Sequence, residues 1–74
     1  MKNISTEQLT EFVEWYFLHF SCEETDKVCF LVSMEGFLHI GERQAKTCLS
    51  RCKEQGLIIC RNGIVRKGGH NNDK

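Results

Sequence analysis

The sequence predicts a small α+β domain, mainly helical, in which three helices precede a short two-stranded β-hairpin. Two observations lead to this prediction. Apolar residues recur at spacings of three and four over most of the first 55 residues, which is the period of amphipathic helices. Asn62-Gly63 then separates two β-rich runs, and this dipeptide between apolar runs is among the strongest short-range signals for a hairpin.

The first helix is predicted over residues 6–20. Ser5 and Gln8 match a capping box, in which each side chain bonds the backbone amide of the other residue. We expect the apolar side of this helix to face the core. Its stripe of helically spaced residues consists of Leu9, Phe12, Val13, Tyr16, Phe17 and Phe20.

The aromatic content of this helix leaves a second interpretation open. Five aromatic residues fall within nine positions, which is more than a narrow core stripe needs in so small a domain. Exposed aromatic patches usually mark interfaces. In this interpretation, the residues that contact a protein partner, or a second copy of the chain in a symmetric dimer, are Phe12, Trp15, Tyr16 and His19.

A second helix is predicted over residues 26–38, capped by Thr25 or Asp26. Residues 21–26 are expected to form a polar connection without a strand. Residues 39–41, with the sequence His-Ile-Gly, follow as a tight turn of the kind that joins two helices at a steep angle.

The third helix is predicted over residues 42–55. Gly56 stands directly after it, where the chain needs a left-handed conformation that glycine adopts readily. The inward face of this helix is expected to consist of Ala45, Cys48, Leu49 and Cys52.

The hairpin is expected to pair residues 57–61 with residues 64–67 around the two-residue turn. This register places Cys60 opposite Val65 on one face of the hairpin. The other face then carries Arg61 and Arg66.

The stretch from Ile40 to Ile58 resembles the recognition helix and first wing strand of bacterial winged-helix regulators. In that family a small residue, an aliphatic pair, a large aliphatic residue and Gly-Leu-Ile recur at this spacing. With the hairpin included, the resemblance covers residues 26–67. The matching positions are Ala45, Cys48-Leu49, Cys52 and Gly56-Leu57-Ile58.

Three departures from the family pattern are visible. Cys52 replaces the usual leucine, the wing tip has only two residues, and no strand is evident between the first two helices. The resemblance therefore implies a minimal winged helix-turn-helix module that binds double-stranded DNA.

The resemblance also implies that helix 42–55 enters the major groove and that hairpin 57–67 follows the DNA backbone. Arginine, lysine and glutamine can read base edges, while basic and hydroxyl side chains also hold phosphates. The alternative for any one surface helix is a merely solvated polar face. The candidate DNA-binding residues are Arg43, Gln44, Lys46, Thr47, Ser50 and Arg51 on the helix, with Arg61, Arg66 and Lys67 on the hairpin.

The charge distribution supports this interpretation although the formal net charge is zero. Residues 1–41 contain two lysines and seven acidic residues, a balance of −5. Residues 42–74 contain eight basic and three acidic residues, a balance of +5. Such a split indicates a basic working face, and it also permits head-to-tail association of the chain.

The five cysteines favour a reduced, intracellular protein. An odd number argues against a closed disulfide framework, and the N-terminus has no signal-peptide pattern. Cys48 and Cys52, with His39 nearby in sequence, could be combined into a zinc site, but paired Cys-x-x-Cys motifs are absent. Core packing is the favoured interpretation of these thiols, and neither a metal nor a membrane span is expected.

The sequence thus predicts a single cytoplasmic domain over residues 1–67, with a disordered tail over residues 68–74. Its expected function is that of a small, non-catalytic DNA-binding protein: a transcriptional regulator, or an architectural or recombination accessory factor. A homodimer would present two recognition helices to a two-fold DNA site. The alternative is a protein-interaction or dimerisation module that uses helix 6–20. No enzyme, cofactor or small-molecule substrate is expected, because so short a chain leaves little room for a deep pocket.

Overall fold

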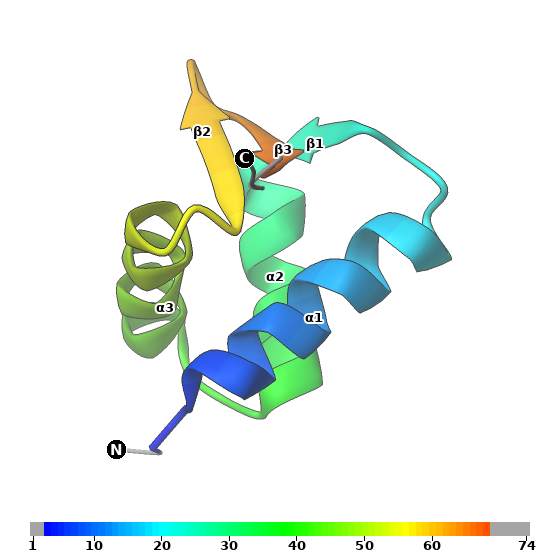
Figure 1. Cartoon of the computed structure of the whole chain (residues 1–74). Coiled ribbons are helices and arrows are strands. Elements are labelled where there is room, and N and C mark those ends of the chain that lie inside the picture. The colour runs from blue at the N-terminus through cyan, green and yellow to red at the C-terminus, as the bar shows by residue number, and fades with distance from the viewer. Residues whose placement is uncertain (1–2, 69–74) are drawn as a thin grey trace.

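The computed structural model describes residues 3–68, which form α1 (Thr6–His19), β1 (Glu24–Asp26), α2 (Lys27–Leu38), α3 (Glu42–Glu54), β2 (Ile58–Arg61) and β3 (Ile64–Lys67). Figure 1 shows α2 in the middle of the molecule, α1 crossing it, α3 at its side and the strands closing one end. The prediction of a mainly helical α+β domain is therefore confirmed.

Two of the helices, α1 and α2, begin at the caps that the sequence indicates. Gln8 Oε1 accepts from the Ser5 backbone N at 2.9 Å, and Ser5 Oγ accepts from the Gln8 N at 3.2 Å, so the capping box is formed. Asp26 caps α2, because its Oδ1 accepts from the Val28 N at 2.7 Å. Each predicted helix is one residue too long, and the extra residues serve as caps: Phe20, Asp26 and Gln55.

Three residues separate α2 from α3, as the predicted tight turn requires. His39 ends α2 in the left-handed conformation, with φ of 56°. This conformation lets the Ile40 N donate to the Glu35 carbonyl at 3.1 Å, which satisfies a carbonyl of the last turn. Gly41 is extended, with φ of −84°, and precedes α3 without a side-chain cap. The left-handed residue of this turn is therefore a histidine and not its glycine.

Gly56 ends α3 with φ of 76°. The Leu57 N donates to the Cys52 carbonyl at 2.9 Å and the Gly56 N to the Lys53 carbonyl at 3.2 Å, which is the bonding of a Schellman motif. The hairpin turn likewise has positive φ at both central residues, 51° at Asn62 and 75° at Gly63. These local features are as predicted.

The strands pair in the predicted register, with Cys60 opposite Val65 and Ile59 opposite Arg66. The expectation of no strand between the first two helices is wrong. β1 pairs antiparallel with β3, placing Thr25 opposite Val65, and the sheet has the order β1-β3-β2. The three polar residues of β1 have no apolar alternation of their own, so only the unpaired edge of β3, 40 residues later in the chain, makes them a strand.

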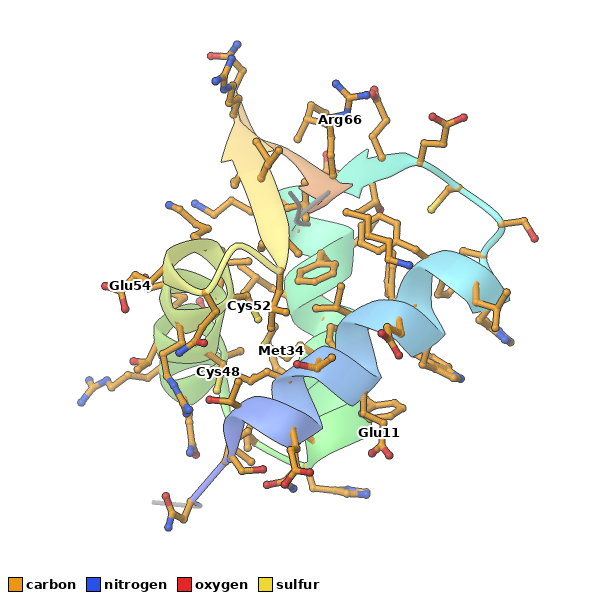
Figure 2. The ribbon with its side chains drawn as sticks, in the orientation of Figure 1. Glu11, Met34, Cys48, Cys52, Glu54 and Arg66 are labelled. Atoms are coloured by element: carbon orange, nitrogen blue, oxygen red, sulfur yellow. The ribbon has the colours of Figure 1, made fainter. Side chains whose placement is uncertain are left out.

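The core lies between the three helices and the inner face of the sheet. Phe12 is fully buried and meets Phe30 edge-on, with ring centroids 5.1 Å apart. Figure 2 shows Met34, Cys48 and Cys52 pointing into the space between the helices, and all three side chains are buried. The interpretation of Cys48 and Cys52 as small apolar core residues is confirmed.

Gly68 belongs to this fold. It is buried, and its N donates to the Leu57 carbonyl at 2.7 Å, which extends the β2–β3 pairing by one step. The predicted start of the tail at residue 68 is therefore one residue too early. The remaining tail, residues 69–74, lies outside the described residues.

Candidate nucleic-acid interface

The exposed face of α3 is the first part of the candidate interface. The helix buries Ala45, Cys48, Leu49 and Cys52 and has a mostly polar sequence otherwise, so its opposite side is left to solvent. Four of the six candidate residues on this helix are exposed: Arg43, Lys46, Thr47 and Ser50.

The other two candidates on α3 are placed differently. Gln44 is half-buried. Arg51 is also half-buried, and its Nη1 donates to the Ile4 carbonyl at 2.6 Å. The prediction that Arg51 belongs to the outward face is therefore wrong. Its guanidinium holds the segment before α1 against α3, a contact between residues 47 positions apart that helical periodicity cannot reveal.

Acidic residues lie among the exposed basic side chains of α3. Lys46 Nζ is 3.4 Å from Glu42 Oε2, one turn earlier, and both side chains are well exposed. Figure 2 shows Glu54 pointing away from the body of the protein at the other end of the helix. Thr47 Oγ1 donates to the Arg43 carbonyl at 3.3 Å. Among the exposed cations of α3 in the structure of residues 3–68, Arg43 and Lys53 thus have no ion pair with a carboxylate.

The hairpin provides the second part of the interface. Arg61 and Arg66 lie on the outer face of the sheet, together with Ile59 and Ile64. These side chains surround an open hollow of 430 Å³, which Glu24 and Asn62 complete. Lys67 alternates to the opposite side of β3 and is exposed at its end. All three basic candidates of the hairpin can therefore reach solvent.

The unexpected strand β1 changes the electrostatics of this face. It places Glu24 opposite Arg66, and Arg66 Nε lies 3.8 Å from Glu24 Oε1. The acidic and basic halves of the sequence are therefore interleaved on the sheet. β1 also brings a cation that the sequence analysis did not select, because the backbone N of Lys27 donates to the carbonyl of Gly63 in the hairpin turn at 2.8 Å. No local pattern marks Lys27, since its position depends on the pairing of β1 with β3.

The structure divides the residues proposed as an aromatic interface on α1. Phe12 and Tyr16 are buried, and the Tyr16 hydroxyl lies 2.7 Å from Thr25 Oγ1, so neither can form an exposed patch. Trp15 is 37% exposed and stacks on His19 with centroids 5.0 Å apart. Leu18 is 82% exposed beside them, a residue that the sequence analysis did not select.

The buried thiols of α3 have little chemical reactivity in the folded protein. Burial, and to a smaller extent the neighbouring Cys48, raise the pKa of Cys52 to about 12, although Arg51 acts in the opposite direction. Burial also raises the pKa of Cys48. Because the thiolate is the reactive form, these residues act as packing groups at neutral pH.

This shift predicts a loss of stability in alkali. Below pH 9 the Cys52 thiol keeps its proton in both states, so it causes no pH dependence. Between pH 9.0 and about 12 only the unfolded chain loses this proton, so stability falls as the pH rises, by up to about 1.4 kcal/mol per unit from this group. Urea unfolding at several alkaline pH values should show a steeper fall for the natural chain than for Cys52→Ala. Equal slopes of stability against pH for the two proteins would contradict the raised pKa of Cys52.

Among residues 3–68, no group of three His, Cys, Asp or Glu side chains is arranged to hold a metal ion. None of the helices in this part of the chain is long and apolar enough to cross a membrane. Comparisons of the chain with family models, with curated proteins and with solved structures find no match.

Proposed function

We propose that this domain binds double-stranded DNA as a minimal, non-catalytic winged helix-turn-helix, with α3 in the major groove and the β2–β3 hairpin on the backbone. The observation that carries the proposal is the arrangement of α2, the three-residue turn and α3, which leaves one polar face of α3 open to solvent. Arg43, Lys46, Thr47 and Ser50 project from that face.

Two further observations support the proposal. The apparent lack of a strand between the first two helices was a departure from the winged-helix pattern, and β1 occupies that position. The hairpin begins four residues after α3 ends and exposes Arg61, Arg66 and Lys67. Cations on α3 and on the hairpin can therefore contact the same DNA molecule. Their contacts with phosphates would position the protein, and Arg43 could donate to a guanine edge.

Titration of a mixed-sequence duplex by fluorescence anisotropy, at about 50 mM and about 200 mM salt, tests the proposal. Five cations contribute: Arg43, Lys46, Arg61, Arg66 and Lys67. If each neutralises one phosphate, the affinity should fall about 500-fold between the two salt concentrations, because the logarithmic slope is about −0.9 per phosphate. Absence of binding at the lower salt would overturn the proposal.

Matched variants of α3 separate phosphate contacts from base contacts. Arg43→Ala should weaken binding about tenfold and reduce the salt slope by about 0.9. Arg43→Lys keeps the positive charge but loses the bidentate guanidinium. This variant should therefore have the salt slope of the natural chain but not its preference for one duplex sequence. Glu54→Gln removes an exposed negative charge from the same helix and should strengthen binding. A weaker complex with Glu54→Gln would contradict this orientation of α3.

A protein-interaction module is the second candidate function, and the exposure of Leu18 beside Trp15 and Phe20 favours it. Residues 3–26 contain six acidic side chains and no lysine or arginine. The partner that fits this end of α1 is therefore a protein segment with basic residues next to a bulky apolar side chain. Trp15 is the single tryptophan, so its emission would shift when that segment binds and remain constant when DNA binds α3.

A further inference from the structure

An apolar groove between α2 and α3 is separate from the aromatic end of α1. It has a volume of 440 Å³, and α2 contributes Lys27, Val28, Leu31, Val32 and Glu35 to its lining. Val28 is 66% exposed and Val32 is 60% exposed, one turn apart on the same face. Two β-branched side chains so exposed on one helix face are an apolar surface that a partner can cover.

The charges around this groove are self-complementary. Lys27 lies at its N-terminal end on α2 and Glu35 at the other end, about 12 Å further along the helix. The opposite wall contains the Lys46–Glu42 ion pair of α3, which neutralises itself. The groove is therefore neutral as a whole, positive at one end of α2 and negative at the other. Neither a strongly acidic nor a strongly basic partner suits such a pattern.

We propose that a second copy of the chain occupies this groove, with the two α2 helices antiparallel about a two-fold axis. An axis that passes between Val28 and Val32 places each Val28 against the Val32 of the other copy. The same rotation puts each Lys27 on the same side of the helix pair as Glu35 of the other copy, with an offset of about 3 Å along the helix axis that the long lysine side chain can span. The antiparallel helices also set the positive end of each macrodipole near the negative end of the other.

This dimer differs from the one expected from the sequence, which used the aromatic residues of α1, and it does not depend on DNA binding. A contact centred on one 12-residue helix belongs to the small class of specific interfaces, below about 1,200 Å². We therefore expect a reversible dimer with a dissociation constant on the order of 10–100 μM.

Charge reversal gives a test that keeps the fold. Lys27→Glu puts an acid in the first turn of α2 and Glu35→Lys puts a base near its last turn, and both changes suit the helix dipole. Sedimentation velocity of the whole chain without DNA, in reducing agent because Cys29 is exposed, measures the association. Each single variant should dimerise about tenfold more weakly than the natural chain, since two attractive pairs become repulsive.

Two combinations then identify the pairing. An equimolar mixture of Lys27→Glu with Glu35→Lys should form a heterodimer, because the introduced acid of one chain meets the introduced base of the other. The natural Glu35 of the first chain and the natural Lys27 of the second chain form the other attractive pair. The double variant should regain the dissociation constant of the natural chain. Leu18→Glu, on α1 and outside the groove, is the matched control and should leave association unchanged.

The proposal is overturned if the natural chain remains monomeric at about ten times the expected dissociation constant. It is also overturned if the two single variants associate no better together than alone, or if Leu18→Glu abolishes the dimer. DNA titration of the Glu35→Lys chain is a separate measurement, because Glu35 lies outside the candidate DNA interface and this monomer keeps Arg43 and the hairpin arginines.

Discussion

Replacing Phe12 by alanine should lower the free energy of unfolding by about 3–5 kcal/mol. Phe12 is fully buried and its ring contacts Phe30, Phe37 and Tyr16, with centroid separations of 5.1, 5.3 and 5.8 Å. Its removal leaves a cavity where the helices meet, and so small a domain can close it only in part. The total stability of a 74-residue chain is about 4–11 kcal/mol, so this substitution should remove between about a quarter and all of it.

Urea unfolding followed by circular dichroism measures this loss, and Leu18→Ala is the matched control on the same helix. Leu18 is 82% exposed, so its truncation should change the stability by no more than about 0.5 kcal/mol. A Phe12→Ala chain that keeps the unfolding free energy of the natural chain and loses only self-association would contradict the placement of Phe12 in the core. It would instead favour the aromatic interface on α1.

Replacing Gly68 by alanine should cost about 2 kcal/mol. A Cβ at this position would collide with the carbonyl of Gly56 and lie 2.8 Å from the Leu57 carbonyl carbon. These are backbone atoms and cannot rotate away, so the end of β3 must shift. The Gly68 hydrogen bond to the Leu57 carbonyl is then lost, at about 1 kcal/mol, and part of the inner sheet face is uncovered.

Gly36→Ala is the control variant, and it should change the stability in the opposite direction. Gly36 lies inside α2, is exposed, and has nothing within 4 Å of an added Cβ. Alanine favours the helix over glycine by about 1 kcal/mol, so this variant should be more stable than the natural chain. Thermal melts of the two variants should therefore move in opposite directions. Equal shifts would show that Gly68 does not pack against the turn after α3.

The local parts of this fold could be predicted because their signals are local. The capping box at Ser5, the left-handed Gly56 and the Asn62-Gly63 turn each concern neighbouring backbone groups, and each was predicted and formed. The register of the hairpin follows from the turn length alone. The sequence indicated a tight turn over residues 39–41 but not which of its residues is left-handed, and that residue is His39.

The candidate site was predictable only in part, for the same reason. Periodicity identified Arg43, Lys46, Thr47 and Ser50 as the outward face of α3, and these residues are exposed. It could not exclude Arg51, whose partner is the Ile4 carbonyl at the other end of the chain. It also could not divide the aromatic residues of α1, since burial depends on which neighbours cover each ring.

By itself the sequence determined the fold class, the order of the helices, the hairpin register and the amphipathic face of α3. Tertiary structure alone decided the rest: β1 joins the sheet, Glu24 lies 3.8 Å from the Arg66 guanidinium, and Gly68 packs against the turn after α3. The physical reason is the range of the interactions. Caps, turns and helix faces are set within a few residues, whereas strand pairing, ion pairs between strands and the exposure of Val28 and Val32 depend on what the rest of the chain covers.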